Sequence, residues 1–391
     1  MTEPSPATNA SQHSNASPGG RGVTAREIEF RYSERLVPIL KHLNASLLVS
    51  TYAAGKVVSI GWQDDQLCLE FTNFQQAMGL AIGDGRMAVG GKDGVHFLDS
   101  AGTLTPRLPP VGDLAAAYVQ RQTLHTGNIQ IHELAFADDG CLWGVNTLFS
   151  CLCTFDDRYH FVPRWTPPFL SESKLGDQCH LNGLAMDDGR PAFVTALGTT
   201  DTPRGWRDHK SSGGVVVDVA SHRVIAEGFC MPHSPRVDPN DAEWLWLLDS
   251  GRGTLVKMRR DGSERTVVAN YPGYGRGLTL TKQFAFVGLS RGRERSVFGG
   301  VPILESGEPL RCGVVVIDRH DGRSLAYLEF ESGVEELFDV QIHAGNRIGL
   351  RGASVAVDGH DPVWIIPPKE SSKRRKTDVM DRFGVLRQRR E

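Results

Sequence analysis

Short runs of alternating apolar and polar residues recur along most of the chain, and many of them end in an Asp/Gly turn. One example is QAMGLAIGDGRMAVGGKDGVHFLD from Gln76, in which three apolar runs are separated by two turns. Runs of this length and periodicity predict β-strands. Six repeats align on Gly79, Glu133, Gly183, Ser234, Gly277 and Asp339, at steps of 54, 50, 51, 43 and 62 residues. The pattern predicts an all-β fold, a six-bladed β-propeller with four strands in each blade.

The two ends of the repeat region complement each other. The segment 45–71 has three strands and no first strand, whereas FDVQIHAG from Phe338 supplies a single strand. We therefore expect the propeller to be closed by pairing of the N- and C-terminal strands, which removes open sheet edges. Residues 33–43 are expected to form a short helix before the first strand.

Composition sets the limits of the propeller domain, which we predict to span residues 24–366. Residues 1–23 are rich in Ser, Pro, Asn and Gly and are expected to be a disordered tail. Residues 367–391 form a basic tail, for which a solvated terminus is favoured over contact with an acidic partner or nucleic acid.

Net charge and cysteine content narrow the class of protein. The 391 residues include 43 Lys and Arg against 46 Asp and Glu, which makes a dedicated nucleic-acid binder an unfavoured interpretation. No apolar run reaches the length of a membrane span, and the N-terminal segment lacks the apolar core of a signal peptide. The seven scattered cysteines suit reduced thiols. A cytoplasmic protein without a membrane partner is expected, and a protein partner stays open.

Candidate metal ligands occur where each blade begins. The first strand of a propeller blade lines the central channel, so residues at its start converge on one cavity. His132 and His233 stand at the aligned position of their repeats, and His180 lies two residues before the aligned Asn182. We predict a divalent metal site (zinc, iron or manganese) formed by His132, His180, Asn182 and His233. The alternative is that each imidazole only bonds a backbone carbonyl at the end of a strand.

Two long insertions, 198–214 and 290–309, interrupt blades after their second strands. Loops on a rigid scaffold often carry function. Together with channel residues they could form an electropositive pocket for a carboxylate or phosphate, from Arg207, Lys210, Arg236, Arg276, Arg291, Arg293 and Arg295, with apolar contact from Trp206 and Phe298. The alternative is a pair of salt-bridged loops that shield a blade edge.

Several long strings resemble those of a known family. GWRDHKSSGGVVVDV from Gly205, MPHSPRVDP from Met231 and FVGLSRGRERSVFGG from Phe286 resemble an uncharacterised bacterial family of conserved hypothetical β-propeller proteins. That resemblance covers most of residues 35–345 and implies the fold without a function.

A shorter motif, HLNGLAMDDG from His180, resembles a strand of the gluconolactonase/regucalcin-like six-bladed propellers. In that family an Asn at this position binds a divalent ion, and an Asp one blade later is both ligand and base. The resemblance places Asn182 as such a ligand, whereas His233 stands where the family has Asp.

These observations predict a metal-dependent, hydrolase-like enzyme that acts on a small anionic or acyl substrate in the central channel. The ion would activate water or polarise a carbonyl, with Glu133 as general base and Arg236 and Arg276 orienting the anion. The alternative is a non-catalytic ligand-binding or protein-docking propeller. Imidazole rings that meet at one point would favour the metal, and rings bonded to their own blade's backbone would favour the alternative.

Overall fold

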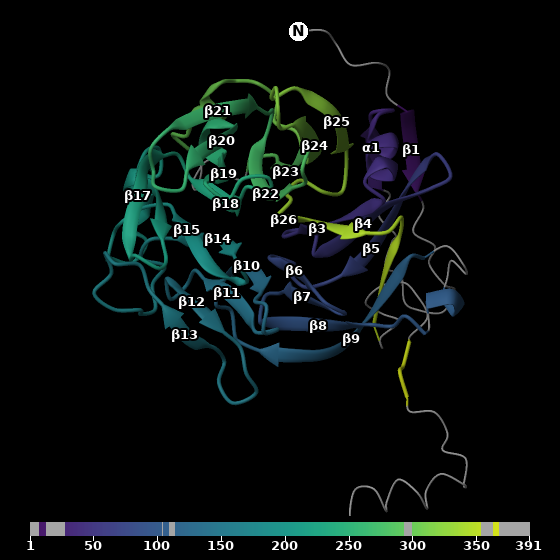
Figure 1. Ribbon diagram of the computed structural model, residues 1–391, viewed down its shortest axis with the longest axis horizontal. Coiled ribbons are helices and arrows are strands. Elements are labelled where there is room, and N and C mark those ends of the chain that lie inside the picture. Colours follow the sequence, from purple (N-terminus) through teal and green to yellow (C-terminus); the bar gives the residue numbers. More distant parts are fainter. Residues whose placement is uncertain are drawn as a thin grey trace, which may run out of the picture.

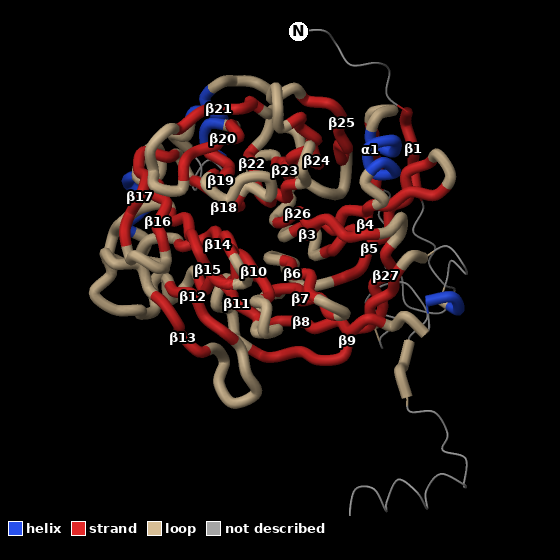
Figure 2. The backbone as a smooth tube through the Cα atoms, viewed as in Figure 1, coloured by secondary structure: helices blue, strands red, loops and turns tan. Residues whose placement is uncertain are grey.

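Six sheets surround a central axis in the computed structural model, which describes residues 8–12, 28–103, 105–108, 114–292, 299–352 and 363–366 (Figure 1). Each sheet forms one blade with four antiparallel strands in order from the axis to the rim, and two of the sheets carry additional strands at the outer edge. Strands make up most of the ring (Figure 2). The predicted six-bladed β-propeller is confirmed.

The blades follow one another in chain order. Blade 1 contains β26 (Asp339–Ala344), β3 (Ala45–Thr51), β4 (Lys56–Gln63) and β5 (Gln66–Asn73). Blade 2 contains β6 (Leu80–Gly83), β7 (Arg86–Gly90), β8 (Gly94–Ser100) and β9 (Ala116–His125). Blade 3 contains β10 (Ile131–Phe136), β11 (Leu142–Asn146), β12 (Cys151–Thr154) and β13 (Val162–Trp165). Blade 4 contains β14 (Leu181–Asp187), β15 (Arg190–Ala196), β16 (Gly214–Asp218) and β17 (Arg223–Phe229). Blade 5 contains β18 (Pro232–Val237), β19 (Trp244–Asp249), β20 (Thr254–Arg259) and β21 (Arg265–Asn270). Blade 6 contains β22 (Tyr274–Leu280), β23 (Phe284–Ser290), β24 (Gly313–Asp318) and β25 (Ser324–Phe330).

The ring closes within blade 1, where the two ends of the repeat region meet. Strand β26 pairs antiparallel with β3, with Asp339 opposite Ser50 and Ala344 opposite Ala45. Figure 1 shows this late strand beside the early strands β3 to β5. The predicted pairing of terminal strands is confirmed.

Three further strands, which the repeat pattern did not indicate, extend two blades at their outer edges. Strand β2 (Ile28–Tyr32) pairs with β25, and β1 (Thr8–Gln12) pairs with β2, within the segment predicted to be a tail. Strand β27 (Ile348–Arg351) pairs in parallel with β9. Sequence reasoning missed them because each is a single short strand outside the repeats.

Apolar layers between the blades hold the ring together. In blade 5 the run WLWLLD sends alternate side chains to opposite faces, so Leu245 and Leu247 pack against blade 4 whereas Trp246 and Leu248 pack against blade 6. Because both faces of a blade are covered, the central strands are apolar at consecutive positions instead of alternating. One buried apolar cluster lies at each of the six interfaces between neighbouring blades.

The expected helix near the start of the chain is α1 (Leu36–His42). It buries Leu36, Val37 and Leu40 in the same cluster as strands of blades 1 and 6. The other short helical elements of the described ranges are α3 (Pro302–Glu305) and three 3-10 turns, η1 (Thr105–Arg107), η2 (Gly205–His209) and η3 (Ser250–Arg252). None of the helices in the described ranges has the length and hydropathy needed to cross a bilayer. Five of the seven cysteines are buried as free thiols.

Closure by β26 leads to a prediction about truncation. A chain that ends after Glu336 lacks β26 and β27, which leaves the inner edge of β3 unpaired and its apolar face open. We expect this variant to lose cooperative thermal unfolding, measured by circular dichroism. A chain that ends after Ile366 keeps every strand described here and should melt like the full-length protein. Cooperative unfolding of the shorter variant would contradict this account of closure.

Candidate functional site

A cavity of about 210 Å³ opens where the inner strands begin. Five of the six aligned positions line it: Met78, His132, His233, Arg276 and Phe338. In blade 4 the lining residue is His180 instead of the aligned Asn182. The cavity therefore lies where the repeat analysis predicted that side chains converge.

His132 and His233 are held in the same way by their own blades. Nδ1 of His132 lies 3.1 Å from the Gln130 carbonyl and 2.7 Å from Oγ1 of Thr147. Nδ1 of His233 lies 2.9 Å from the Met231 carbonyl. It also lies 3.1 Å from Oγ of Ser250.

The hydroxyl partners fix the tautomer of both rings. Thr147 donates its own proton to the Leu181 carbonyl and Ser250 donates to the Gly275 carbonyl, so both hydroxyls accept a proton from Nδ1. Each imidazole therefore carries its proton on Nδ1 and presents a lone pair on Nε2. Burial, together with the charge of Arg276, lowers the pKa of both His132 and His233 well below the ordinary range. Both rings are neutral hydrogen-bond acceptors at neutral pH.

His180 has a different partner, a carboxylate. Its Nδ1 lies 3.0 Å from both oxygens of Asp177, and Nε1 of Trp206 donates to the same carboxylate at 3.1 Å. His180 adopts a left-handed backbone conformation with φ of 52°. Its ring lies beside that of Trp206, with centroids 4.5 Å apart. A carboxylate on Nδ1 orients the ring and holds its proton on Nδ1, as in a His–Asp pair of a hydrolase.

Arg276 places a positive charge on the cavity wall. Its guanidinium pairs with Glu336 at 3.2 Å and donates to Nε2 of His132 at 3.1 Å. It stacks over the ring of Phe338, 4.1 Å from the ring centroid. Only 11% of its side chain is exposed, so it is largely shielded from bulk water.

The first insertion covers part of the cavity mouth. It supplies η2 and brings Arg204, Trp206 and Arg207 to the cavity lining, as predicted for Trp206 and Arg207. The three guanidinium groups of the lining outnumber the carboxylates of Asp177 and Glu336. An anion is therefore favoured over a cation in this cavity.

The other predicted basic residues lie elsewhere. Lys210 is absent from the cavity lining, and Arg291 donates to the Phe330 carbonyl at 2.7 Å. Arg293, Arg295 and Phe298 lie outside the described residues.

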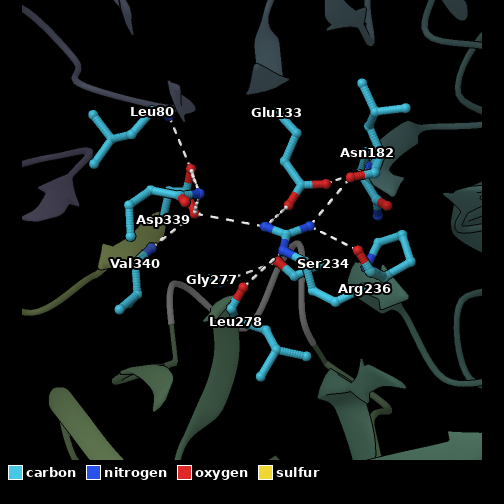
Figure 3. Close-up of polar contacts among 12 residues, drawn as sticks. Leu80, Glu133, Asn182, Ser234, Arg236, Gly277, Leu278, Asp339 and Val340 are labelled. Atoms are coloured by element: carbon cyan, nitrogen blue, oxygen red, sulfur yellow. Dashed lines mark hydrogen bonds and ion pairs between the residues drawn. The ribbon is translucent and has the colours of Figure 1, made fainter. Parts of the chain in front are cut away.

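Beneath the cavity, a buried ion triad joins Glu133, Arg236 and Asp339 (Figure 3). Nη2 of Arg236 lies 2.6 Å from Glu133 and 4.0 Å from Asp339. Glu133 accepts from the Leu184 amide and Asp339 accepts from the Leu80 amide, while Arg236 donates to the Leu278 carbonyl. These contacts reach the inner strands of all six blades.

The triad accounts for two residues that we predicted to act in catalysis. Neither Glu133 nor Arg236 is among the cavity-lining residues. Burial raises the pKa of both Glu133 and Asp339, and the Arg236 charge opposes the shift. Their contacts tie the strands together at the channel centre. Arg276 is the predicted anion-orienting residue that does line the cavity.

Asn182 also forms hydrogen bonds within the propeller ring. Its Nδ2 donates to the Pro232 carbonyl of the next blade at 3.0 Å, and its Oδ1 accepts from Thr195 at 2.6 Å. It makes the same kind of bond to the following blade as Thr147 and Ser250. Its side chain is buried and absent from the cavity lining.

The predicted metal ligands do not combine into one site. Among the described residues, no group of three or more His, Cys, Asp or Glu side chains is arranged to hold a metal ion. Nε2 of His132 already accepts from the positively charged Arg276, and both polar atoms of the Asn182 side chain have partners. Only His180 and His233 present Nε2 atoms without such a partner, and two ligands fall short of a tetrahedral zinc site.

Two carboxylates of the site were not singled out from the sequence. Asp177 lies three residues before His180, and this spacing is a signal that could have been found. Glu336 lies two residues before the aligned Phe338, at a position where the other five repeats carry no acidic residue. Its pairing with Arg276 shows only in the fold.

The triad predicts a large effect on stability. In an Arg236→Met variant, Glu133 and Asp339 stay buried without the opposite charge, and we expect the free energy of unfolding to fall by about 3–5 kcal/mol. Urea denaturation measures it. Arg323→Gln is the control, because Arg323 is 74% exposed and pairs with Asp321 at the surface. Equal midpoints for the two variants would contradict a central role for the triad.

The two neutral imidazoles predict a pH dependence of stability. The unfolded chain takes up protons at His132 and His233 below about pH 6.5, whereas the native state keeps both rings neutral. The free energy of unfolding should therefore fall on acidification, by up to about 1.4 kcal/mol per histidine and pH unit. Denaturation at pH 7, 6 and 5 should give a smaller slope for a His132→Asn/His233→Asn variant. The exposed His320, changed to Asn, should leave the slope as in the wild type.

Three comparisons place this chain beside known proteins. A search of curated proteins finds no match. Among solved structures, a nidogen/laminin complex matches with a TM-score of 0.49 and 11% identity, over 76% of this chain and 98% of that one. A calcium-binding protein, regucalcin, from Agrobacterium tumefaciens has a TM-score of 0.44 and 14% identity, over 65% and 74% of the two chains.

A gluconolactonase from Xanthomonas campestris has a TM-score of 0.46 and 14% identity, over 77% of this chain and 92% of that one. A family model matches residues 34–349. It confirms the resemblance to an uncharacterised propeller family. The chain belongs to the DUF4915 family, which is described as a domain of unknown function.

Proposed function

We propose that the channel cavity binds a small anionic acyl compound and hydrolyses it, with His180 as general base. The observation that supports this proposal is the Asp177–His180 pair, which opens into the same cavity as the guanidinium of Arg276. The cavity is small for a ligand site, since such pockets usually measure about 300–1,000 Å³. A small metabolite fits it, and a polymer would engage only by its end.

The chemistry assigned to each residue is as follows. Arg276 binds the anionic group of the substrate, and Arg204 and Arg207 attract it to the mouth. Nε2 of His180 takes a proton from water, and the water oxygen bonds to the acyl carbon. The bond to the leaving oxygen then breaks, and the proton passes from His180 to that oxygen. Asp177 keeps the imidazole in the required tautomer and stabilises its charged form.

This proposal departs from the sequence-based hypothesis in the metal. The mechanism needs no ion, because His180 has a carboxylate partner and Arg276 occupies Nε2 of His132. A non-catalytic ligand-binding or docking propeller stays as the alternative function. It would use the same anion site without turnover.

The test is hydrolysis of small esters, followed by proton release at constant pH. The panel pairs monoanionic esters such as monomethyl succinate with neutral counterparts such as dimethyl succinate. We expect a preference for the anionic esters, and a drop in kcat of about 100-fold or more in His180→Ala and Asp177→Asn. Arg276→Gln should mainly raise KM, since it removes substrate binding. His209→Ala is the control, because His209 is exposed on the same loop and lies outside the cavity lining.

Two outcomes would overturn the mechanism. Activity that is lost on chelation and restored by zinc, iron or manganese would return the metal-dependent hypothesis. Binding of the anionic compounds without cleavage of any ester would favour the ligand-binding propeller. Metal content of untagged protein, measured by mass spectrometry, should be well below one equivalent if the proposal is right.

A further inference from the structure

His233 is a buried acceptor that the proposed hydrolysis does not use. Its side chain lines the cavity, and the residue is only 4% exposed. No hydrogen bond joins its Nε2 to a described residue, whereas its Nδ1 has two partners, the Met231 carbonyl and Oγ of Ser250. The ring is held against Tyr274, with centroids 5.6 Å apart, so the lone pair has a fixed direction.

The acceptor cannot change into a donor under ordinary conditions. The Ser250 hydroxyl donates its hydrogen bond to the Gly275 carbonyl, so the imidazole proton must stay on Nδ1. Burial and the charge of Arg276 lower the pKa of His233 well below the ordinary range, which excludes a second proton on Nε2 near neutral pH. A ligand that fills the cavity must offer Nε2 a proton donor or leave a buried acceptor unpaired.

Arg276 and His233 therefore set two different requirements in one small space. Arg276 and His233 both line the same cavity of about 210 Å³, so the two groups are neighbours there. The guanidinium selects a negative group, and Nε2 selects an O–H or N–H group. An ammonium is disfavoured as that donor, because guanidinium groups outnumber carboxylates around the cavity.

We propose that the ligand of the channel cavity is a hydroxycarboxylic acid or its acyl derivative, with the carboxylate on Arg276 and a nearby hydroxyl donating to Nε2 of His233. This inference rests on the proposed function and adds the substrate class to it. His233 is a specificity-determining residue in this arrangement, and His180 remains the base.

The experiment compares matched compounds that differ by one hydroxyl. Calorimetric titration with malate and succinate, and with lactate and propionate, measures the preference. We expect the wild type to bind the hydroxylated member of each pair about tenfold more tightly. His233→Phe should bind both members with equal affinity while it still prefers carboxylates to the corresponding amides. Arg276→Gln should lose affinity for all four acids.

A second measurement covers the case in which His233→Phe fails to fold. In the wild type labelled with ¹⁵N-histidine, the Nε2 resonance of His233 should shift on addition of malate and stay in place on addition of succinate. Equal affinity for malate and succinate, with no such shift, would overturn this inference and leave the proposed function standing. Failure of all four acids to bind would overturn the proposed function itself.

Discussion

The guanidinium of Arg236 lies near the central axis, where the inner strands of all six sheets meet. It pairs with Glu133 and approaches Asp339, and the bonds that these three side chains make with backbone groups extend to every inner strand (Figure 3). The apolar layers between blades set how neighbours pack, but each acts on one interface only. The triad acts on the whole ring. Charges at this depth are favourable only when paired, so their positions are specified to within a hydrogen bond.

The cavity inherits its order from the same strands. His132 directly precedes Glu133, and Phe338 directly precedes Asp339, so the triad fixes the height of the residues above it. Since neighbouring residues of a strand point to opposite sides, the irregular pairing near the start of β10 and β18 is what lets both layers face the axis. Hydroxyl groups of Thr147 and Ser250 then fix the imidazole tautomers. Their donor and acceptor atoms are therefore oriented before any ligand enters, which is electrostatic preorganisation.

Sequence periodicity was enough to predict the blades, their number and the closing strand, because each depends on local alternation and a repeat of fixed length. It also located the convergence of Met78, His132, His233, Arg276 and Phe338. Periodicity could not tell which residues line the cavity and which belong to the ion triad, because the two kinds of residue can be direct neighbours on one strand, as His132 and Glu133 are. Asn182 and Glu133 stand at or beside the aligned position, yet both have buried partners in other blades. Contacts such as Arg276 with Glu336 join residues 60 apart and leave no local pattern.

Closure through β26 also constrains how the chain is made. Strand β3 leaves the ribosome almost 300 residues before the strand that completes its blade, and β2 waits a similar length for β25. At about 5–20 residues per second, the first blade keeps an unpaired edge for roughly 15–60 s of synthesis. During that time the middle blades can form in order, while β2 and β3 still lack their partners β25 and β26. The nascent chain therefore depends on protection of its early strands, and the ring is complete only after β26 has been synthesised.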